Sequence, residues 1–479
     1  MTAPSSSGRS DRHHVVIVGG GISGLAAAHR LTEDADPPRI TLLEASPRFG
    51  GWIRTGRIDG WIVEDGPDLF LGSKPGAWEL CERLGLAGRL HGTSPRARGA
   101  YVSRAGRLYR IPDGLTGLVP TRAAPFLRSP LLSPTAKLRV ALEPLVPRRK
   151  DDEDESVESF VVRRLGREMY DRLVEPLLSG IYAGDGSQLG ILATFPQFRE
   201  SERAHGGLVR AMLRARRPAA TRGFVSLPTG MQELPEALVA RLRARGAELR
   251  AGAGVTDVER AGDGWTVRLA DGSALSCTHL IVATPAPAAA RLLDAHAPDA
   301  AAALREIPHA STITVSLGHR AADVPRPLDA TGYLVPRVER RPALACTWAS
   351  AKFDGRAPEG HVLFRVFLGG AARPPVAGLD DDAAIGLARA ELAEQLGVRG
   401  EPVLVRVARQ SNAMPQYLVG HRERVARVRR AIAGIPSLAL LGNALDGVGI
   451  PDCVRGAESA AARLLTSFRS PAPPFPDSP

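Results

Sequence analysis

The sequence predicts a mixed fold of the α/β and α+β classes, with a parallel sheet, a second, mixed sheet and a helical insert. Three observations predict it: a strand–helix–strand pattern at the N-terminus, alternating apolar and polar positions from residue 249 onward, and short apolar segments interleaved with Pro and Arg after residue 120. At 479 residues the chain is long for one core. Because single domains usually contain about 100 to 200 residues, we expect two or three packed units.

The N-terminal strand and helix come first along the chain. Val15 to Val18 is an apolar run that stops at three glycines, and Ile22 to Leu31 continues with helical spacing and an Ala-rich face. A second apolar stretch, Ile40 to Leu43, ends in Glu44. We therefore expect a βαβ unit of ordinary length.

The composition changes after residue 119. Pro120 to Arg149 interleaves short apolar pieces with Pro and Arg, and the acidic run Asp151 to Glu155 follows, so we place a boundary here. Ser156 is expected to cap a helix that ends before Gly166, with Glu158 in its first turn and two arginines in its last turn. We expect the acidic run itself to be solvated.

Most of the later elements are predicted strands. Leu249 to Val282 alternates apolar and polar positions between turns, which is typical of a β-meander that closes with the strand Leu280 to Val282. A strand pair is predicted in AYVSRAGRLYRIP, further strands at Thr312 to Leu317, Ala343 to Trp348, His361 to Leu368 and Leu438 to Leu441, and helices at Asp380 to Leu396 and Asp452 to Leu465.

Composition excludes several classes of protein. Hydrophobic residues make up 44% and charged residues 24% of the chain, which excludes disordered, collagen-like and coiled-coil classes. The net charge is +11, but no zinc-finger or RNP signature accompanies it, so we expect no nucleic-acid partner. The four cysteines are widely spaced and no His pair has metal-ligand spacing, so we expect a cytoplasmic protein without a metal site. We expect neither a signal peptide nor a membrane span.

The strongest motif follows the first strand. Gly19, Gly21 and Gly24 form GxGxxG between strand and helix, and Glu44 ends the next strand. In a Rossmann-like unit such glycines let a pyrophosphate approach the backbone, the helix N-terminus stabilises its charge, and the acid hydrogen-bonds a ribose. The sequence therefore predicts a dinucleotide site, and the acid argues against NADP.

The residues after Glu44 resemble a flavoenzyme fingerprint. In EASPRFGGWIRT, Arg48 and the pair Gly50-Gly51 resemble the extended fingerprint of the flavin-containing amine-oxidase superfamily. The resemblance implies a Rossmann-like FAD-binding domain of the amine-oxidase type with FAD held non-covalently. The stretch that ends at Val255 resembles the superfamily's strand on the adenine side.

Four longer segments resemble one branch of that superfamily. They are GWIVEDGPDLFL, LVEPLLSGIYAGDGSQLGILATFPQF, KFDGRAPEGHVLFRVFLGG and GNALDGVGIPDCVRGAESAA. Together they span nearly the whole chain and resemble the bacterial coproporphyrinogen III and protoporphyrinogen oxidase family. The FAD-binding residues that the resemblance implies are Gly19, Gly20, Gly21, Ile22, Ser23, Gly24, Glu44, Ala45, Arg48, Gly50, Gly51, Trp52, Gly66, Pro67, Asp68, Leu69, Val255, Gly442, Asn443, Val448, Gly449 and Ile450.

The end of the last segment suits a flavin for a physical reason. The N-terminus of a helix that starts near Asp452 directs partial positive charge at the pyrimidine edge of the flavin, which becomes anionic on reduction. Pro451 is expected at the first helical position, where its missing N–H costs nothing. Cys453 is expected to be a small packed residue and not an attachment point for FAD.

The resemblance implies that the flavin carries the chemistry, so no side chain is assigned as catalytic. Arg98 is expected to hold a propionate through its bidentate fork, with plain solvent exposure as the alternative. Gly180 and Tyr182 are expected to wall the macrocycle. Lys352 is interpreted as part of a turn and receives no role.

The domains are expected to be discontinuous. The FAD-binding domain comprises residues 12–91, 223–300 and 436–470, and the mixed-sheet substrate-binding domain comprises residues 92–115 and 301–435. Residues 116–222 form a helical insert that either faces a membrane or packs as a lid. Residues 1–11 and 471–479 are expected to be disordered tails.

The resemblance implies a six-electron oxidation of coproporphyrinogen III to coproporphyrin III in haem biosynthesis, with dioxygen reduced to hydrogen peroxide. We prefer this substrate over protoporphyrinogen IX for two reasons taken together. The Arg-rich composition indicates a GC-rich bacterial source, and the resemblance associates that branch of bacteria with the coproporphyrin route. Another amine oxidase, a carotenoid desaturase and a non-catalytic porphyrin carrier are the alternatives. Product hand-over to a ferrochelatase and peripheral contact with the inner face of the membrane are the further partners considered.

Overall fold

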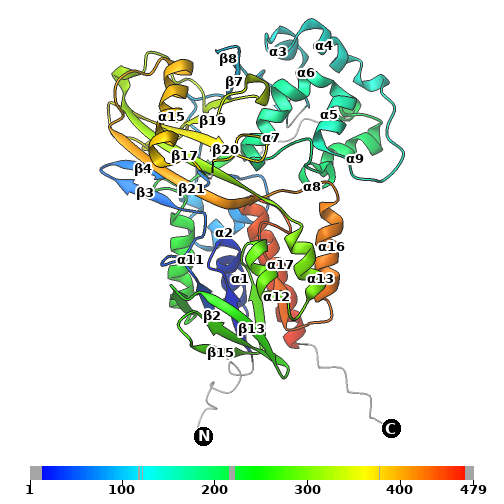
Figure 1. The fold of residues 1–479 in the computed structure, drawn as a ribbon, viewed down its shortest axis with the longest axis vertical. Coiled ribbons are helices and arrows are strands. Elements are labelled where there is room, and N and C mark those ends of the chain that lie inside the picture. The colour runs from blue at the N-terminus through cyan, green and yellow to red at the C-terminus, as the bar shows by residue number, and fades with distance from the viewer. Residues whose placement is uncertain (1–12, 117–118, 121, 215–221, 377, 470–479) are drawn as a thin grey trace.

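The computed structural model describes residues 13–116, 119–120, 122–214, 222–376 and 378–469. The two predicted tails, residues 1–11 and 471–479, lie outside these ranges. The described chain is mixed in class, with a parallel sheet, a large mixed sheet and a group of helices (Figure 1), which confirms the predicted fold class.

A five-stranded parallel sheet contains the predicted N-terminal βαβ unit. Its strand order is β12–β2–β1–β16–β22, and all four neighbouring pairs are parallel. Val15 and Ile17 pack into one core, and Val16 and Val18 pack into another on the opposite face. Burial on both faces explains why this strand is an uninterrupted apolar run. The strands are β1 (His14–Val18), β2 (Arg39–Glu44), β12 (Glu248–Ala251), β16 (His279–Val282) and β22 (Leu438–Leu440).

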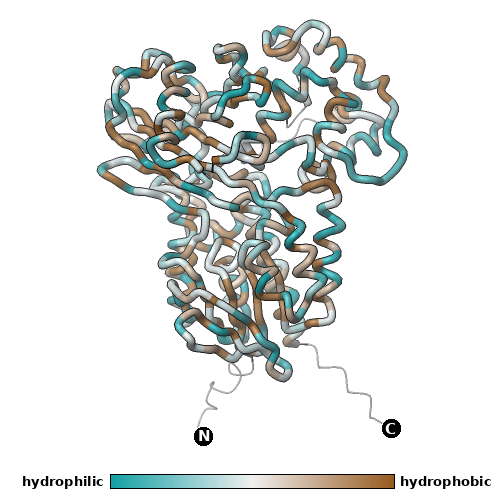
Figure 2. Tube along the Cα trace, viewed as in Figure 1, coloured by the Kyte–Doolittle hydropathy of each residue, from teal (hydrophilic) through white to brown (hydrophobic). Residues whose placement is uncertain are grey.

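Helices cover both faces of this sheet in the lower half of Figure 1. The first helix packs against the last, so the two ends of the chain share one core. Figure 2 shows the outer helix α16 as mostly hydrophilic, as expected for a helix with one face in solvent. The helices are α1 (Ile22–Thr32), α2 (Ala77–Arg83), α11 (Glu233–Ala244), α12 (Ala286–Leu293), α13 (Pro298–Arg305), α16 (His421–Ile432) and α17 (Ile450–Arg469).

The predicted meander from Leu249 to Val282 was wrong as a single unit. Its first and last strands, β12 and β16, join the parallel sheet, and only β13 (Val255–Ala261), β14 (Gly264–Leu269) and β15 (Ala274–Cys277) form an antiparallel sheet. Local alternation of polarity does not reveal this, because β12 and β16 choose partners far away in the sequence.

A seven-stranded sheet forms the upper left of Figure 1. Its order is β21–β17–β20–β19–β18–β7–β8, antiparallel except for the parallel pair β18–β7. The strands predicted near residues 101–110, 312–317, 343–348 and 361–368 all lie in it. Its elements are β7 (Tyr101–Arg104), β8 (Arg107–Arg110), β17 (His309–Arg320), β18 (Gly332–Leu334), β19 (Ala343–Trp348), β20 (His361–Gly369) and β21 (Leu404–Pro415), with α14 (Ala349–Lys352) and α15 (Asp381–Leu396) beside it.

Short strands link these parts. They are β3 (Thr55–Ile58) paired with β4 (Trp61–Glu64), β9 (Leu115–Thr116) paired with β10 (Val119–Pro120), and β11 (Phe224–Ser226) between β5 (Phe70–Leu71) and β6 (His91–Gly92).

A group of helices with its own core forms the upper right of Figure 1. The predicted helix after the acidic run is confirmed: Ser156 caps α5 by accepting from the Ser159 amide at 3.0 Å, and Gly166 ends it. The helices are α3 (Ala123–Arg128), α4 (Pro134–Ala141), α5 (Val157–Leu165), α6 (Arg167–Met169), α7 (Glu175–Tyr182), α8 (Ile191–Thr194), α9 (Pro196–His205) and α10 (Leu208–Arg214), with short helical turns at Glu143–Leu145 (η2) and Tyr170–Val174 (η3).

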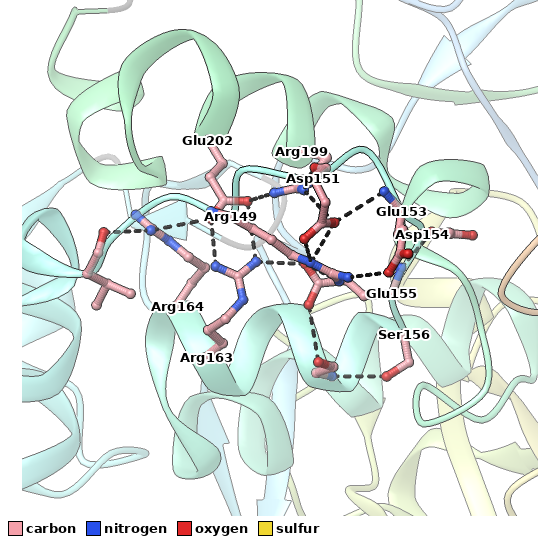
Figure 3. A network of polar contacts seen from close by, with 12 residues as sticks. Arg149, Asp151, Glu153, Asp154, Glu155, Ser156, Arg163, Arg164, Arg199 and Glu202 are labelled. Carbon is pink, nitrogen blue, oxygen red and sulfur yellow. Dashed lines mark hydrogen bonds and ion pairs between the residues drawn. The ribbon is translucent and has the colours of Figure 1, made fainter.

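The acidic run is only partly solvated, which corrects the prediction (Figure 3). Glu155 is buried and accepts from Arg163 at 2.7 Å. Asp154 accepts the amides of Leu192 at 3.1 Å and Gly420 at 3.0 Å. The run therefore joins the helical group to the start of α16, because arginines and backbone amides replace the water that would otherwise solvate these carboxylates.

A buried ion network lies beside this run in Figure 3. Glu202 is fully buried and accepts from Arg163 at 2.6 Å and from Arg199. Arg164 is also fully buried and pairs with Glu143. These pairs connect η2, α5 and α9, so they hold the helical group in one arrangement.

Candidate functional site

The candidate cofactor site begins at the glycine turn between β1 and α1. Gly19 has φ of 111°, and a Cβ on Gly24 would lie 1.9 Å from the carbonyl oxygen of Gly19. These two positions therefore require glycine. Gly21 differs, because a Cβ there would meet no described atom within 4 Å. Its outer side is open space that a ligand can occupy.

The start of α1 is suited to an anion. Gly21 is its N-cap, and no side chain in the described ranges caps it. The amides of Ile22, Ser23 and Gly24 thus lack intrahelical partners and point to the open side of the turn. Since the positive end of the helix dipole lies here too, a pyrophosphate fits this position.

Glu44 lies beside the turn and holds its shape. Its carboxylate accepts from the amide of Gly20 at 2.7 Å and from the amide of Ser46 at 2.8 Å. A carboxylate has about four lone-pair positions, so two remain for ribose hydroxyls. The carbonyl of Glu44 accepts from Ala253, which brings the β12–β13 connection alongside.

The predicted adenine side lies next to this acid. A Cβ on Gly254 would lie 3.7 Å from the Cβ of Ala45, and Val255 opens β13 directly afterwards. The structure thus brings the start of β13 at Val255 alongside Glu44 and Ala45, which lie far from it in the sequence.

Arg48 donates to backbone carbonyls of its own turn, whereas the fingerprint implies that it binds the dinucleotide. It donates to the carbonyls of Phe49 and Ile53, each at 3.2 Å, and to that of Gly51 at 2.6 Å. Burial lowers the pKa of its guanidinium from the ordinary value. Arg48 therefore shapes the turn at Gly50 and Gly51, and Gly50 in turn donates to the carbonyl of Gly20 at 2.8 Å.

The segment from Gly66 to Leu69 begins beside that turn, in contact with Trp52. A Cβ on Gly66 would lie 1.9 Å from the carbonyl oxygen of Trp52, so the two backbones touch. Trp52 itself is 41% exposed. Pro67 and Asp68 follow, and Asp68 pairs with Lys352 at 2.7 Å.

A second glycine turn, from Gly442 to Gly449, precedes α17. Gly442 and Gly447 have φ of 132° and 136°. The helix begins at Ile450, so the prediction that Pro451 takes the first helical position was wrong by one residue. Pro at the second position is still tolerated, because its N–H would lack an intrahelical partner there as well.

The helical group reaches this second turn. Val448 packs against the core that contains Tyr182 and Tyr417. The Tyr417 hydroxyl donates to the carbonyl of Asn443, and its ring stacks on His421 with centroids 4.0 Å apart. Tyr182 is buried, and burial raises the pKa of its hydroxyl. It donates to the carbonyl of Thr194 at 3.3 Å.

The predicted substrate residues are not all brought together. Gly180 is exposed on α7, where a Cβ would lie 3.3 Å from Leu334. Arg98 is exposed in the loop before β7 and donates to the carbonyl of Pro95 at 3.1 Å. Within the described chain, no hydrogen bond or ion pair joins Arg98 to Gly180 or Tyr182.

The interpretation of Lys352 as a turn residue missed its partner. Lys352 lies in the last position of α14, and its Nζ and the guanidinium of Arg365 both approach Asp68. One signal was available: Arg365 interrupts the apolar strand VLFRVFLG, and an arginine inside a central strand requires a buried partner. Nothing local in the sequence indicates which carboxylate that is.

Comparison with known proteins accounts for these features. The family described as flavin containing amine oxidoreductase matches residues 22–465. The chain belongs to this family. FAD is therefore the cofactor, and the open side of Gly21, the uncapped start of α1 and the remaining lone pairs of Glu44 fit it.

This chain is similar to several relatives over most of its own length and most of theirs. The chain is 36% identical to the coproporphyrinogen III oxidase of Bacillus subtilis (strain 168), covering 95% of this chain and 98% of that protein. It is 33% identical to the protoporphyrinogen oxidase of Homo sapiens, covering 94% and 98%. A crystal structure of a candidate protoporphyrinogen oxidase from Exiguobacterium sp. 255-15 has a TM-score of 0.84 at 32% identity, covering 95% and 99%.

Two further observations bear on this flavin oxidoreductase. Among the residues that the structure describes, no group of three or more His, Cys, Asp or Glu is arranged to hold a metal ion. In the same residues, no helix has both the length and the apolar character needed to cross a membrane.

Proposed function

We propose that this flavin oxidoreductase oxidises coproporphyrinogen III to coproporphyrin III in haem biosynthesis. The observation that carries the proposal is the contact between the second glycine turn and the helical group: Val448 packs against the core that contains Tyr182. A flavin that extends from Gly21 to this turn would have its reactive end beside α7. The bacterial relatives named coproporphyrinogen III oxidase support the choice of substrate.

The chain's own residues bind and orient in this proposal. The α1 amides would hold the pyrophosphate, Glu44 would hold the ribose, and the N-terminus of α17 would stabilise negative charge on the ring. When bound, FAD supplies a hydride acceptor for a bridge carbon of the porphyrinogen. Tyr182 and Gly180 would border the macrocycle, while Arg98 would hold a propionate at the mouth of the site. No side-chain nucleophile is required.

The complete reaction removes six electrons in three rounds. In each round the substrate would give up one hydride from a bridge carbon and one proton, and dioxygen would take up two electrons and two protons to become hydrogen peroxide. Noncovalent FAD is supported by the state of Cys453. Its thiol lies 3.6 Å from the carbonyl of Gly447, and burial raises its pKa to about 12, so it is not a thiolate at neutral pH.

The domain assignment follows the sheets. The parallel sheet and most of its helices would form the FAD-binding domain, from residues 12–91, 223–300 and 436–470, whereas α16 and most of α13, which also pack beside this sheet, lie outside these ranges. The seven-stranded sheet would form the substrate-binding domain, from residues 92–115 and 301–435. The helices between them, within residues 116–222, would form the insert.

The insert also carries the features expected of peripheral membrane contact. Leu127, Leu138, Leu145 and Leu213 are exposed, Leu145 at 75%. The short η2 turn, which ends at Leu145, contacts both α4 and α10. We place the protein in the cytoplasm, in part on the inner face of the membrane. There it would pass its porphyrin to a ferrochelatase.

The test is anaerobic mixing of the flavin-loaded enzyme with each porphyrinogen separately, followed by admission of air. The expected result is faster flavin bleaching by coproporphyrinogen III than by protoporphyrinogen IX, with porphyrin fluorescence and peroxide appearing on aeration. Preference for protoporphyrinogen IX would favour the second candidate, which the human relative supports. Bleaching by neither, with tight porphyrin binding, would indicate a carrier.

A further inference from the structure

Asp68 is held by two cations that come from distant parts of the chain. Lys352 of α14 donates its Nζ to the carboxylate at 2.7 Å, and Nη1 of Arg365 in β20 lies 3.5 Å away. Their side chains are 12% and 2% exposed. Both cations belong to the seven-stranded sheet and its helix, whereas Asp68 lies between β4 and β5.

The cluster holds more positive than negative charge. It contains one carboxylate and two cations, and the second terminal nitrogen of Arg365 donates to the carbonyl of Gly66 at 2.6 Å. The Nε of Arg365 is buried and has no hydrogen-bond partner among the described residues. Because an unbalanced buried charge is costly, the cluster is expected to face something that carries negative charge.

The charged forms of Asp68 and Lys352 stabilise each other. Burial acts to raise the pKa of Asp68, but Lys352 and Arg365 outweigh it and lower that pKa from its ordinary value. Burial lowers the pKa of Lys352, and the Asp68 carboxylate opposes that shift. Each partner thus preserves the charge of the other.

The cluster is connected to the dinucleotide turn through touching backbones. A Cβ on Gly51 would lie 3.1 Å from the Cα of Gly21, and a Cβ on Gly66 would lie 1.9 Å from the carbonyl oxygen of Trp52. Two successive backbone contacts therefore link the segment that starts at Gly66 to the dinucleotide turn. Asp68 lies two residues further on.

We propose that Lys352 and Arg365, one positive charge in excess of Asp68, form a positioning and charge-stabilising centre for the reduced flavin. The inference rests on the proposed function, because it requires the flavin to lie along Gly66 to Leu69. A hydride carries two electrons and one proton, so its transfer from the substrate leaves one negative charge on the ring system. A fixed cationic centre lowers the free energy of that charge without reorganisation.

Sulfite binding tests this without turnover. Sulfite adds to oxidised flavin and leaves a negative charge on the ring, so its dissociation constant reports the local charge. Lys352→Met reduces the net charge of the cluster from +1 to 0 and should weaken sulfite binding by about tenfold or more. Asp68→Asn raises it to +2 and should tighten binding. The double variant returns it to +1 and should bind as the natural enzyme does.

An effect of charge changes sulfite affinity in opposite directions in Lys352→Met and Asp68→Asn, whereas structural damage would weaken binding in both variants. Arg96→Met is the matched control, because Arg96 forms an exposed ion pair with Asp354 at 2.6 Å in the adjoining loop, and its sulfite binding should be unchanged. If Lys352→Met and Asp68→Asn both weaken binding, or both leave it unchanged, the cluster does not stabilise flavin charge and the inference is overturned. If the natural protein retains no flavin, the proposed function fails first, which is a distinct result.

Discussion

Glu44 has two tasks at the scale of a single residue, and they can be separated. Its carboxylate accepts the amides of Gly20 and Ser46 and, in the proposed complex, the ribose hydroxyls. Glu44→Ala leaves two amides without their acceptor, at about 1 to 3 kcal/mol each. We expect purified protein that is folded but nearly colourless. The ratio of flavin to protein absorbance, with a circular dichroism melt, measures this, and full flavin occupancy would remove the assignment. Glu44→Gln keeps an acceptor and should retain more flavin.

Arg98 offers a prediction about substrate alone. Among the described residues, its exposed guanidinium donates a hydrogen bond to the carbonyl of Pro95 in its own loop and to no other group, so replacing it should not disturb the fold. We expect Arg98→Ala to raise the KM for coproporphyrinogen III by about tenfold, the value of one charge-assisted hydrogen bond, while flavin content stays constant. Steady-state kinetics of Arg98→Ala measure the KM, with Arg96→Ala as the control variant. Equal KM values for the two variants would remove Arg98 from the site.

The turn between β1 and α1 makes a prediction at the scale of an element. A Cβ on Gly24 would lie 1.9 Å from the carbonyl oxygen of Gly19, whereas a Cβ on Gly21 would meet only open space. We expect Gly24→Ala to lower the melting temperature of the protein even without FAD, because α1 must move away from β1. Gly21→Ala should melt normally without FAD but bind FAD at least about tenfold more weakly, since the methyl group occupies the ligand's place. Identical behaviour of the two variants would contradict this account.

The ion network on α9 makes the helical group sensitive to acid. Burial acts to raise the pKa of Glu202, but hydrogen bonds from Arg163 and Arg199 lower it from its ordinary value. A carboxylate whose pKa is lower in the folded state stabilises the fold above its unfolded pKa of about 4.3. That stability is lost as pH falls through the folded pKa.

Glu202→Gln should therefore destabilise the protein at neutral pH, by about 3 to 5 kcal/mol, because it removes the carboxylate that accepts from the buried Arg199 and from Arg163. Its melting temperature should depend less on pH below about pH 5 than that of the natural protein. Thermal melts across this range measure both effects. Glu200→Gln on the exposed side of the same helix is the control, and a pH dependence in Glu202→Gln as steep as in the control would refute the role.

At the scale of the whole molecule, the insert's surface predicts membrane binding. Exposed leucines on α3, α4, η2 and α10 lie near exposed Arg128 and Arg148, and the chain carries a net charge of +11. We expect cosedimentation with vesicles that contain anionic phosphatidylglycerol and much less with neutral vesicles. Leu138→Ser with Leu145→Ser should abolish binding and preserve activity toward dissolved substrate. Val403→Ser with Val405→Ser, at exposed positions near and in β21, is the control; equal losses in both pairs would contradict a specific face.

Much of this molecule follows from local patterns. The strand, turn and helix at the N-terminus, the Ser156 cap and five of the seven strands of the large sheet were predictable, because period-two and period-3.6 patterns and caps depend on neighbours in sequence. The strands β18 and β21 were not predicted. The meander failed, because β12 and β16 complete a sheet whose other strands lie elsewhere. Asp154 and Glu155, two of the five residues in the acidic run, were misjudged for the same reason, since their partners Arg163 and the amides of Leu192 and Gly420 come from other elements.

The sequence by itself determined the glycine turn, the acid at Glu44 and the family of flavin oxidoreductases. Each of these depends on short motifs, and the spacing of residues within a short motif fixes its local geometry. Only the tertiary structure decided which groups meet: Val448 with the core that contains Tyr182, and Lys352 and Arg365 with Asp68. The physical reason is that a buried charge or ring needs a partner in space, and the fold supplies that partner from any part of the chain.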